Sequence, residues 1–455
     1  MAALVIVAAI VLWSVPAAAA GFFLPTRGVE ATGRGGAKVA PHQADLDAIW
    51  HNPAGLTGLG GFQLQVDAAL VGIRAEHHRA PRQMDDGSTR TYEPVQNQAS
   101  PSAIPQVVVG GRTPIADITW AFGAYSPYAG TGRYPLNGAQ RYVLVDNVGS
   151  AMGYLHAAVG WQATDRLALG AGIQNFMGEM RIVAVGSGYT GMYGDPEDED
   201  LDLLGVATIG SYFNLTANMG ATFRVHDRLQ TGLSVQLRHR IHDPEATLET
   251  RFPDHPSYDN AETTSDEIDI ALPFPFYVRT GLRYIGDRFD AEFALVYQHW
   301  SVVDEYVATP DEVEITGVPA VESVPVAPLV IPQEFRNTIS AHLGGEFSLS
   351  EPVDLRAGYV FERGAVPDHR YSVMTLDPDK HQLSVGGSYH FGAGQRGLTL
   401  DLSTAFIVMP SKQITNSEVR QVNPSSPDGD HSIVVGNGTY DHSGFIVGLG
   451  IRSRF

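Results

Sequence analysis

Residues 335–347 read FRNTISAHLGGEF, and their character changes at every second position. Ile339, Leu343 and Phe347 fall on one side of this alternation, whereas polar residues such as His342 fall on the other. Because successive side chains of a β-strand point to opposite faces, the stretch is predicted to be a strand with one apolar and one polar face. The same alternation recurs in two further segments, KHQLSVGGSYHF at 380–391 and FIVGLGIRSRF at 445–455.

The composition is compatible with a membrane barrel. The chain has 455 residues, 44% of them hydrophobic, and beyond residue 20 it contains no apolar run long enough to predict a membrane-spanning helix. A β-barrel hides its hydrophobicity in alternation, so an ordinary average composition is expected for one. Acidic residues outnumber basic ones by 50 to 30, and the resulting charge of −20 argues against a nucleic-acid partner.

The sequence carries no motif of a known catalytic or metal site. It lacks HExxH, GxSxG and a Walker loop, and it contains no cysteine. The acidic segment 195–202 (DPEDEDLD) lacks the spaced ligands of an EF-hand and is interpreted as a solvated loop. His77–His78 and His239–His242 are pairs without a third ligand, which are more often surface histidines. We therefore expect no enzyme activity, no cofactor and no metal.

Residues 1–20 (MAALVIVAAIVLWSVPAAAA) are interpreted as a signal peptide. They combine an apolar core with a small-residue end, where Ala18 and Ala20 fit a signal-peptidase site. The alternative, an N-terminal membrane anchor, is less favoured because the run is short and ends in alanines. Gly21 is then the first residue of the exported protein.

Short and long connections alternate between the predicted strands. The short, polar ones are TPIAD (113–117), TDR (164–166), HDR (226–228), GDR (286–288) and SEP (350–352). The long ones are 75–103, 129–147, 186–204, 242–267, 303–334 and 410–439. This is the layout of an outer-membrane barrel with periplasmic turns and extracellular loops. Counting the alternating segments predicts an all-β, antiparallel transmembrane barrel of about fourteen strands.

Four blocks of the chain resemble the FadL/TodX family of outer-membrane transporters for long-chain fatty acids and other hydrophobic compounds. They are GRGGA (33–37), DAIWHNPAGL (47–56), LPFPFYVRTGLRY (272–284) and the distal segments between 335 and 391. The resemblance implies a multi-pass barrel of residues 59–455 in the outer membrane of a Gram-negative bacterium, acting as a monomer. It also implies that the terminal Phe455 is the signal read by the barrel-assembly machinery.

The resemblance further implies that residues 21–58 form a plug, or hatch, inside the lumen. Within it, Asn52, Pro53 and Ala54 would form a rigid polar turn, because Asn bonds to backbone groups and Pro restricts both itself and the residue before it. The alternative is an ordinary linker turn before the first strand. The apolar start of the plug is expected to take part in gating; it comprises Gly21, Phe22, Phe23 and Leu24.

The third predicted strand has a break. ITWAFGAYSPYAGTGRY (118–134) begins by alternating and then meets Pro127, Tyr128 and Gly130. Proline cannot donate to a ladder and glycine weakens one, so pairing with a neighbouring strand should fail there. In a closed barrel such a failure makes a hole in the wall. The alternative is that the strand ends at Pro127 and a loop begins.

These features predict passive uptake of hydrophobic compounds, long-chain fatty acids or hydrocarbons, with outer-membrane lipid and lipopolysaccharide as the surroundings. The solute would pass from an extracellular groove to a lumenal pocket and leave sideways through the break in the third strand. The expected groove residues are Tyr189, Met192, Tyr193, Leu203, Leu204 and Phe252, although packing of these loops on one another explains them equally well. The alternative functions are a general polar porin and an outer-membrane lipid hydrolase.

Overall fold

The computed structural model describes residues 26–455 apart from 42, 44, 85, 116, 129, 190, 192–193, 257, 318–322, 392–396 and 424–431. The predicted signal peptide and the segment Gly21–Leu24 lie outside the described residues, as do Met192 and Tyr193. No helix in the described part of the chain is long and apolar enough to cross a membrane.

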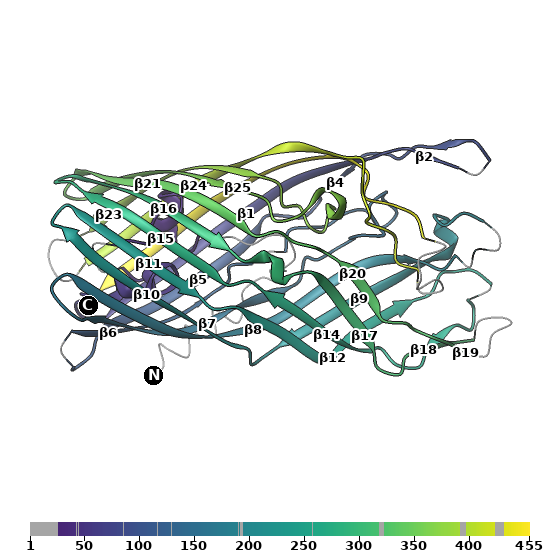
Figure 1. The fold of residues 1–455 in the computed structure, drawn as a ribbon, viewed down its shortest axis with the longest axis horizontal. Coiled ribbons are helices and arrows are strands. Elements are labelled where there is room, and N and C mark those ends of the chain that lie inside the picture. Colours follow the sequence, from purple (N-terminus) through teal and green to yellow (C-terminus); the bar gives the residue numbers. More distant parts are fainter. Residues whose placement is uncertain are drawn as a thin grey trace.

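The wall of the molecule is one closed antiparallel barrel of 14 strands, as predicted (Figure 1). Strand β1 pairs with β25 along all of its 17 residues and also pairs with β5, which closes the cylinder. Uninterrupted wall strands are β1 (Gln63–Arg79), β5 (Ser102–Arg112), β6 (Ile118–Tyr125), β7 (Ala151–Gln162), β8 (Leu167–Ser187), β22 (Val353–Glu362), β23 (Lys380–Phe391), β24 (Gly397–Ile414) and β25 (Gly438–Arg454).

Each of the remaining wall strands consists of two segments in line, separated by a break of a few residues. They are β10 (Leu215–His226) after β9 (Asp202–Ser211), β12 (His239–Arg251) after β11 (Leu229–Gln236), β15 (Tyr277–Ile285) after β14 (Glu267–Phe274), β17 (Glu305–Pro310) after β16 (Phe289–Gln298), and β21 (Thr338–Ser350) after β20 (Leu329–Pro332). In each of these five wall strands, one segment lies nearer the short turns and the other lies nearer the long loops. This part of the wall therefore has two zones along its length.

Shorter elements lie in the loops and inside the barrel. The small strands are β2 (Arg82–Gln83), β3 (Thr89–Arg90), β4 (Val95–Gln96), β13 (Glu262–Thr263), β18 (Glu314–Thr316) and β19 (Ser323–Pro325). The helices are α2 (Val29–Gly33), α3 (Ala48–His51), and the 3-10 turns η1 (Pro53–Leu56), η2 (Glu199–Leu201), η3 (Trp300–Val302) and η4 (Asp368–Arg370). In Figure 1 the long loops extend to the right, and the C-terminus lies at the left among the short turns.

The two faces of the wall differ in polarity in the way the alternation predicts. On β25, Phe445, Val447 and Leu449 point outward and are 40–49% exposed. Arg452 points inward, where its Nη1 lies 2.5 Å from a carboxylate oxygen of Glu30. This arrangement keeps charge away from lipid, where an Arg at mid-membrane costs about 2–4 kcal/mol.

The long connections contain more strand than the sequence predicts. The expected loop 242–267 includes most of β12, which continues to Arg251. Beyond the membrane neither face of a strand meets lipid, so the apolar alternation fades although the hydrogen-bonded ladder continues. The pattern of residues therefore marks the membrane zone rather than the full length of the strands.

Candidate functional site

The first described residues, 26–59, lie inside the barrel and are almost entirely buried. Helix α2 contacts β22 to β25, whereas η1 contacts β7, β8 and β10 on another part of the wall. In Figure 1 this purple segment is seen within the left part of the barrel, near the short turns. The lumen is thus filled at its periplasmic end.

Buried ion pairs and charge-assisted hydrogen bonds fasten this segment to the wall. Arg34 forms a bidentate ion pair with Asp290 of β16, and Glu30 accepts from Arg452. Glu292 of β16 accepts the backbone N–H of Val39 at 2.6 Å. Removing one partner of a buried pair leaves an uncompensated charge, which costs about 3–5 kcal/mol. These contacts therefore oppose displacement of the segment.

The Asn-Pro-Ala turn occupies the contact between the lumenal segment and β10. Asn52 is fully buried; its Nδ2 donates to Val39 O at 2.7 Å and to Ala221 O at 3.1 Å. Its Oδ1 accepts the N–H of Ala54 at 3.2 Å and caps η1, which begins at Pro53. One side chain thus satisfies backbone groups of the turn, of a distant part of the segment and of the wall.

The wall makes room for this turn with glycines. A Cβ at Gly170 would lie 2.3 Å from the carbonyl carbon of Pro53, and one at Gly220 would lie 2.0 Å from Asn52 Oδ1. Both separations are far below van der Waals contact, so only glycine permits the turn to approach the wall this closely. The fit between turn and wall explains the Asn-Pro-Ala block better than a linker does.

Strand β6 ends at Tyr125, and the residues that follow it, Ser126 and Pro127, lead to the buried Tyr128. Ser126 Oγ donates to Tyr128 O at 2.8 Å, and Gly130 O accepts from Ser102 of β5 at 3.0 Å. Tyr128 is 2% exposed. Because β5 and β6 pair only as far as Gln106 and Tyr125, the ladder of the wall is interrupted beyond that point.

Two lumenal groups meet at this interruption. Arg27 of the N-terminal segment donates from Nη1 to Ser126 O at 2.5 Å. The Tyr128 ring lies 5.5 Å from that of Phe176 and 5.3 Å from that of Phe274, with both pairs edge to face. The inward turn of the third strand is therefore held both by the plugged lumen below and by an aromatic cluster.

A cavity of about 870 Å³ lies on the extracellular side of this aromatic cluster. Tyr128 and Phe274 form part of its lining, together with apolar residues of β8, β9, β12, β14 and β17. Those wall residues are Met180, Ile182, Leu203, Ala207, Ile209, Leu248, Ile268, Ile270, Leu272, Tyr306 and Ala308. Cavities of this size and apolar character bind hydrophobic ligands with few polar contacts.

One side of the cavity is polar. Lys380 Nζ lies 2.7 Å from Glu362 and 2.6 Å from Asp377, and Gln298 donates to Glu362 at 3.0 Å. The single Lys380 ammonium is shared by two carboxylates, so each charged group on the polar side has a partner while the cluster keeps one excess negative charge. Sequence reasoning missed these residues because Gln298, Glu362 and Lys380 lie at the ends of three different strands, and only the closed barrel brings those ends together.

The predicted groove residues separate in the structure. Leu203 lines the cavity from β9, whereas the neighbouring Leu204 packs against the cluster around Val183 and Val185. Phe252 stacks on Tyr258 at 6.1 Å, and Tyr189 accepts from Asn423 through its backbone oxygen. Residues 326–333 also line the cavity. Their sequence, VAPLVIPQ, is apolar and rich in proline, but it was not predicted to be part of the site.

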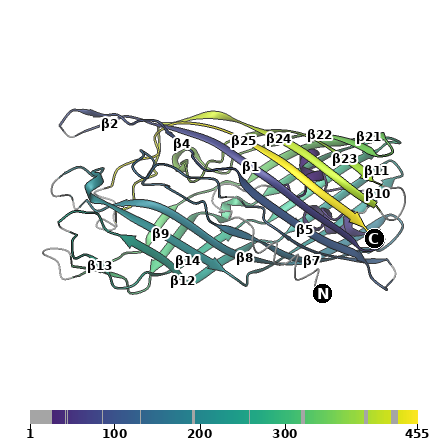
Figure 2. The same ribbon diagram turned by 180° about the vertical axis from the view of Figure 1, so that it is seen from behind.

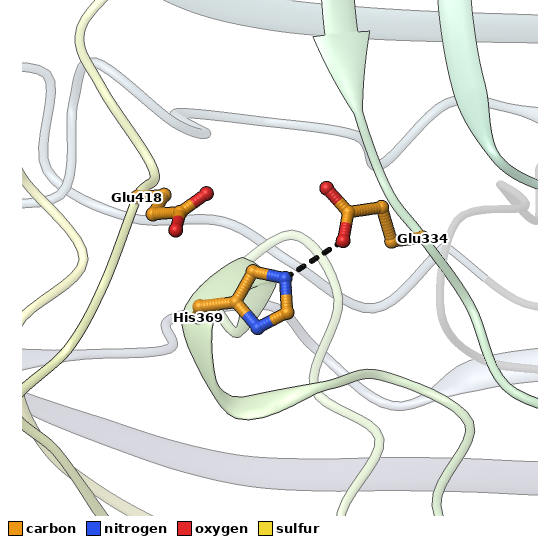
Figure 3. A group of neighbouring side chains, drawn as sticks. All are labelled: Glu334, His369 and Glu418. Carbon is orange, nitrogen blue, oxygen red and sulfur yellow. Dashed lines mark hydrogen bonds and ion pairs between the residues drawn. The ribbon is translucent and has the colours of Figure 1, made fainter.

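Three loops bring Glu334, His369 and Glu418 together at the cavity mouth (Figure 3). Their ligand atoms lie within 4.8 Å of one another, and His369 Nε2 is 2.9 Å from Glu334. Arg370 forms ion pairs with both glutamates, at 2.5 and 2.9 Å. Hydrogen bonds from Arg370 and His369 lower the pKa of the Glu334 carboxyl. The cluster is accounted for as an ion-pair network that links the loops.

The sequence profile of the family described as "Outer membrane protein transport protein (OMPP1/FadL/TodX)" matches residues 10–455. The chain belongs to this family. This OMPP1/FadL/TodX chain is thus a β-barrel of the Gram-negative outer membrane, from a family described as transport proteins.

Individual proteins are also similar to this chain. Outer membrane protein P1 of Haemophilus influenzae is 24% identical over 155 residues, 34% of this chain, and the match spans only 30% of the length of P1. A FadL homologue of Pseudomonas aeruginosa has the same fold, with a TM-score of 0.76 at 15% identity over 96% of this chain and all of that one. The toluene transporter TodX of P. putida gives 0.63 at 14% identity over 95% and 99%.

Proposed function

We propose that this channel carries its solute from the extracellular loops into the apolar cavity and then sideways into the outer leaflet through the break in β6. The observation that supports this route most directly is the position of the cavity. Its lining includes Tyr128, the first aromatic residue beyond the end of β6 at Tyr125. A solute in the cavity is therefore separated from the interrupted wall by one aromatic side chain.

A lateral exit suits a hydrophobic solute for energetic reasons. Each methylene buried from water is worth about 0.8 kcal/mol, so a chain of about fourteen methylenes resists entry into the periplasm by roughly 11 kcal/mol. Passage from an apolar cavity into lipid avoids this cost. Leu203, Tyr189 and Phe252, with Met192 and Tyr193, are proposed to guide the solute toward the cavity.

In this account residues 21–58 act as a plug that stays in place, and residues 59–455 act as the barrel. The ion pair of Arg34 with Asp290 and the hydrogen bonds of Asn52 support a fixed plug. Solutes of the kinds carried by the relatives, fatty acids or monoaromatic hydrocarbons, are the proposed substrates. We also propose that the channel acts as a monomer and is assembled by recognition of its last strand, ending at Phe455.

The test restores the third strand. Pro127→Val together with Gly130→Val supplies the missing backbone donor and a strand-forming side chain, which should extend the pairing of β6. We expect uptake of radiolabelled palmitate or toluene into vesicles to fall at least fivefold, while binding in detergent stays within twofold. Uptake at the unmodified rate by a variant with a closed wall would contradict the lateral exit.

A matched pair of substitutions controls for the chemistry of the change. Pro81 is exposed near the hairpin of β2 and β3, and a Cβ at Gly60 would meet no atom within 4 Å. Pro81→Val with Gly60→Val should therefore leave both uptake and binding unchanged. A loss of uptake in this control would show that the effect at Pro127 and Gly130 is not specific to the wall.

A further inference from the structure

A second interruption of the wall lies between β9/β10 and β11/β12. Nearer the short turns, β10 and β11 pair as far as Asn218 and Gln236. Nearer the loops, β9 and β12 pair again from Thr208 and Thr247. Between these two paired zones, residues 209–216 and 238–246 form no ladder pair with one another, and the structure describes all of these residues. One backbone hydrogen bond, from Leu237 N to Ala217 O, lies at the end of the gap nearer the short turns.

The two neighbouring seams of the barrel are paired across the same region, and a further gap lies one seam along, between residues 272–276 and 299–306. On one side, β8 pairs with β9 up to Gly178 and Ser211 and with β10 from Asn175 and Leu215, so that junction is nearly continuous. On the other side, β12 and β14 pair across the same region, starting at His239 and Phe274, with a bulge between Asp243 and Ala246. Two adjacent strands have therefore separated while each keeps its other neighbour.

Side chains replace the missing backbone bonds across the seam. The N–H of Gly210 donates to Asp243 Oδ2 at 2.6 Å, Thr216 Oγ1 donates to Leu237 O at 2.9 Å, and Asn214 Nδ2 donates to Arg240 O. A backbone N–H that donates to a side-chain carboxylate lies farther from the opposite strand than one that donates to a backbone carbonyl in a β-ladder. Pro244, which has no N–H, lies on one edge of the seam.

Apolar surface lies on both sides of this seam. Ile209 and Leu248 line the cavity behind it, at the edges of β9 and β12. In front of it, Tyr212 and Phe213 are 74% and 79% exposed, the highest values among the large apolar side chains that the structure describes. The segments that meet there, β9 and β12, are visible in the view from behind (Figure 2).

The lower edge of the seam lies at membrane depth. Strand β11 has 8 residues between its short turn and the seam, as β6 has before its own break. Eight residues advance about 26 Å along a strand and, at a tilt of about 40°, roughly 20 Å across the membrane, within an apolar band about 25 Å tall. Solute at this edge would meet the outer leaflet rather than water.

We propose that this seam is a second lateral window, through which apolar solutes pass between the cavity and the outer leaflet. It takes uncharged hydrocarbon or the acyl part of a lipid, because its faces are aliphatic and aromatic. The Asp243 carboxylate on the N–H of Gly210 acts as its latch. The proposal rests on the proposed function, since both concern the same cavity, but it assigns that cavity a second exit.

A reversible crosslink tests the window directly, because the chain contains no cysteine of its own. A Cβ at Gly210 would lie 3.7 Å from Asp243 Oδ2 with no closer clash than 3.6 Å, so Gly210→Cys with Asp243→Cys places two thiols across the seam. The matched control is Thr208→Cys with Thr247→Cys, on the same two strands where they already pair. Both pairs are made in the Pro127→Val, Gly130→Val background, and uptake of radiolabelled toluene is measured.

We expect the uptake that survives in this background to fall at least fivefold when the Gly210–Asp243 pair is oxidised and to return on reduction, with no change in the control. Unchanged uptake with a complete crosslink would overturn the window. So would a background with no residual uptake, which would leave the third-strand exit, and thus the proposed function, intact. If the unmodified protein neither binds nor takes up toluene or palmitate, the proposed function itself fails.

Hydrogen exchange supplies a second readout that does not depend on crosslinking. In lipid nanodiscs the amides of 238–246 that do not donate to β14 should exchange at least tenfold faster than the amides of 218–223, which have ladder partners on both sides. Equal protection of the two stretches would overturn the window.

Discussion

Individual residues carry the contact between plug and wall, and Asn52 is the clearest case. Asn52→Ala leaves the carbonyls of Val39 and Ala221 without this donor, at a cost of about 1–3 kcal/mol for each buried group left unsatisfied. We expect a lower midpoint of thermal unfolding and a higher ion conductance, but only a mild loss of uptake. Gln83→Ala, which removes an exposed hydrogen bond on the β2–β3 hairpin, is the control. Unaltered stability and conductance in Asn52→Ala would contradict the assigned role.

Tyr128 is the second residue whose substitution tests the proposed route. Tyr128→Ala removes a ring that packs on Phe176 and Phe274 and separates the cavity from the third-strand break. We expect the dissociation rate of bound solute, measured by stopped flow, to rise at least tenfold. Tyr128→Phe keeps the ring and should stay within twofold of the unmodified rate. Equal rates for the two variants would show that the ring is not a barrier.

At the scale of elements, the link between α2 and β25 is a measurable interaction. Glu30→Gln, Arg452→Gln and the double variant form a cycle, and a direct buried contact predicts a coupling of at least about 1 kcal/mol. Each residue also has a second partner, Asp401 for Arg452 and Lys38 for Glu30, so both single changes should be destabilising. The free energies come from reversible unfolding in detergent. Additive effects would show that plug and barrel are not coupled through this pair.

The elements that could be predicted from the sequence are those in which contact with lipid imposes an alternation of apolar and polar residues. The membrane part of β21, around Ile339 and Leu343, and of β25, around Leu449, was predictable because lipid on one face and lumen on the other enforce a period of two. The break after Tyr125 was predictable from Pro127. The seam at Pro244 was not, because residues 238–246 (RHRIHDPEA) are mostly polar or charged and resemble a loop.

At the scale of the whole molecule, the cavity was beyond sequence reasoning for a topological reason. Its walls combine β8, β9, β12, β14 and β17 with loop residues near 330 and 420, so its shape depends on how distant connections fold over the barrel mouth. The position of residues 26–59 inside the barrel was expected only through the family resemblance, since no periodicity marks these residues. The central claim is that solute leaves sideways while this plug stays in place.

Locking the plug to the wall tests that claim most directly. A Cβ at Gly281 of β15 would lie 3.0 Å from Val39 Cβ and 2.7 Å from Glu292 Oε1, so Val39→Cys with Gly281→Cys brings two thiols together between plug and barrel once the Glu292 side chain shifts. Uptake of radiolabelled palmitate and toluene is then compared in the same vesicles before and after oxidation. The account predicts equal rates, because neither lateral exit requires the plug to move. Uptake that stops on oxidation and resumes on reduction would contradict it and would assign transport to a displaced plug.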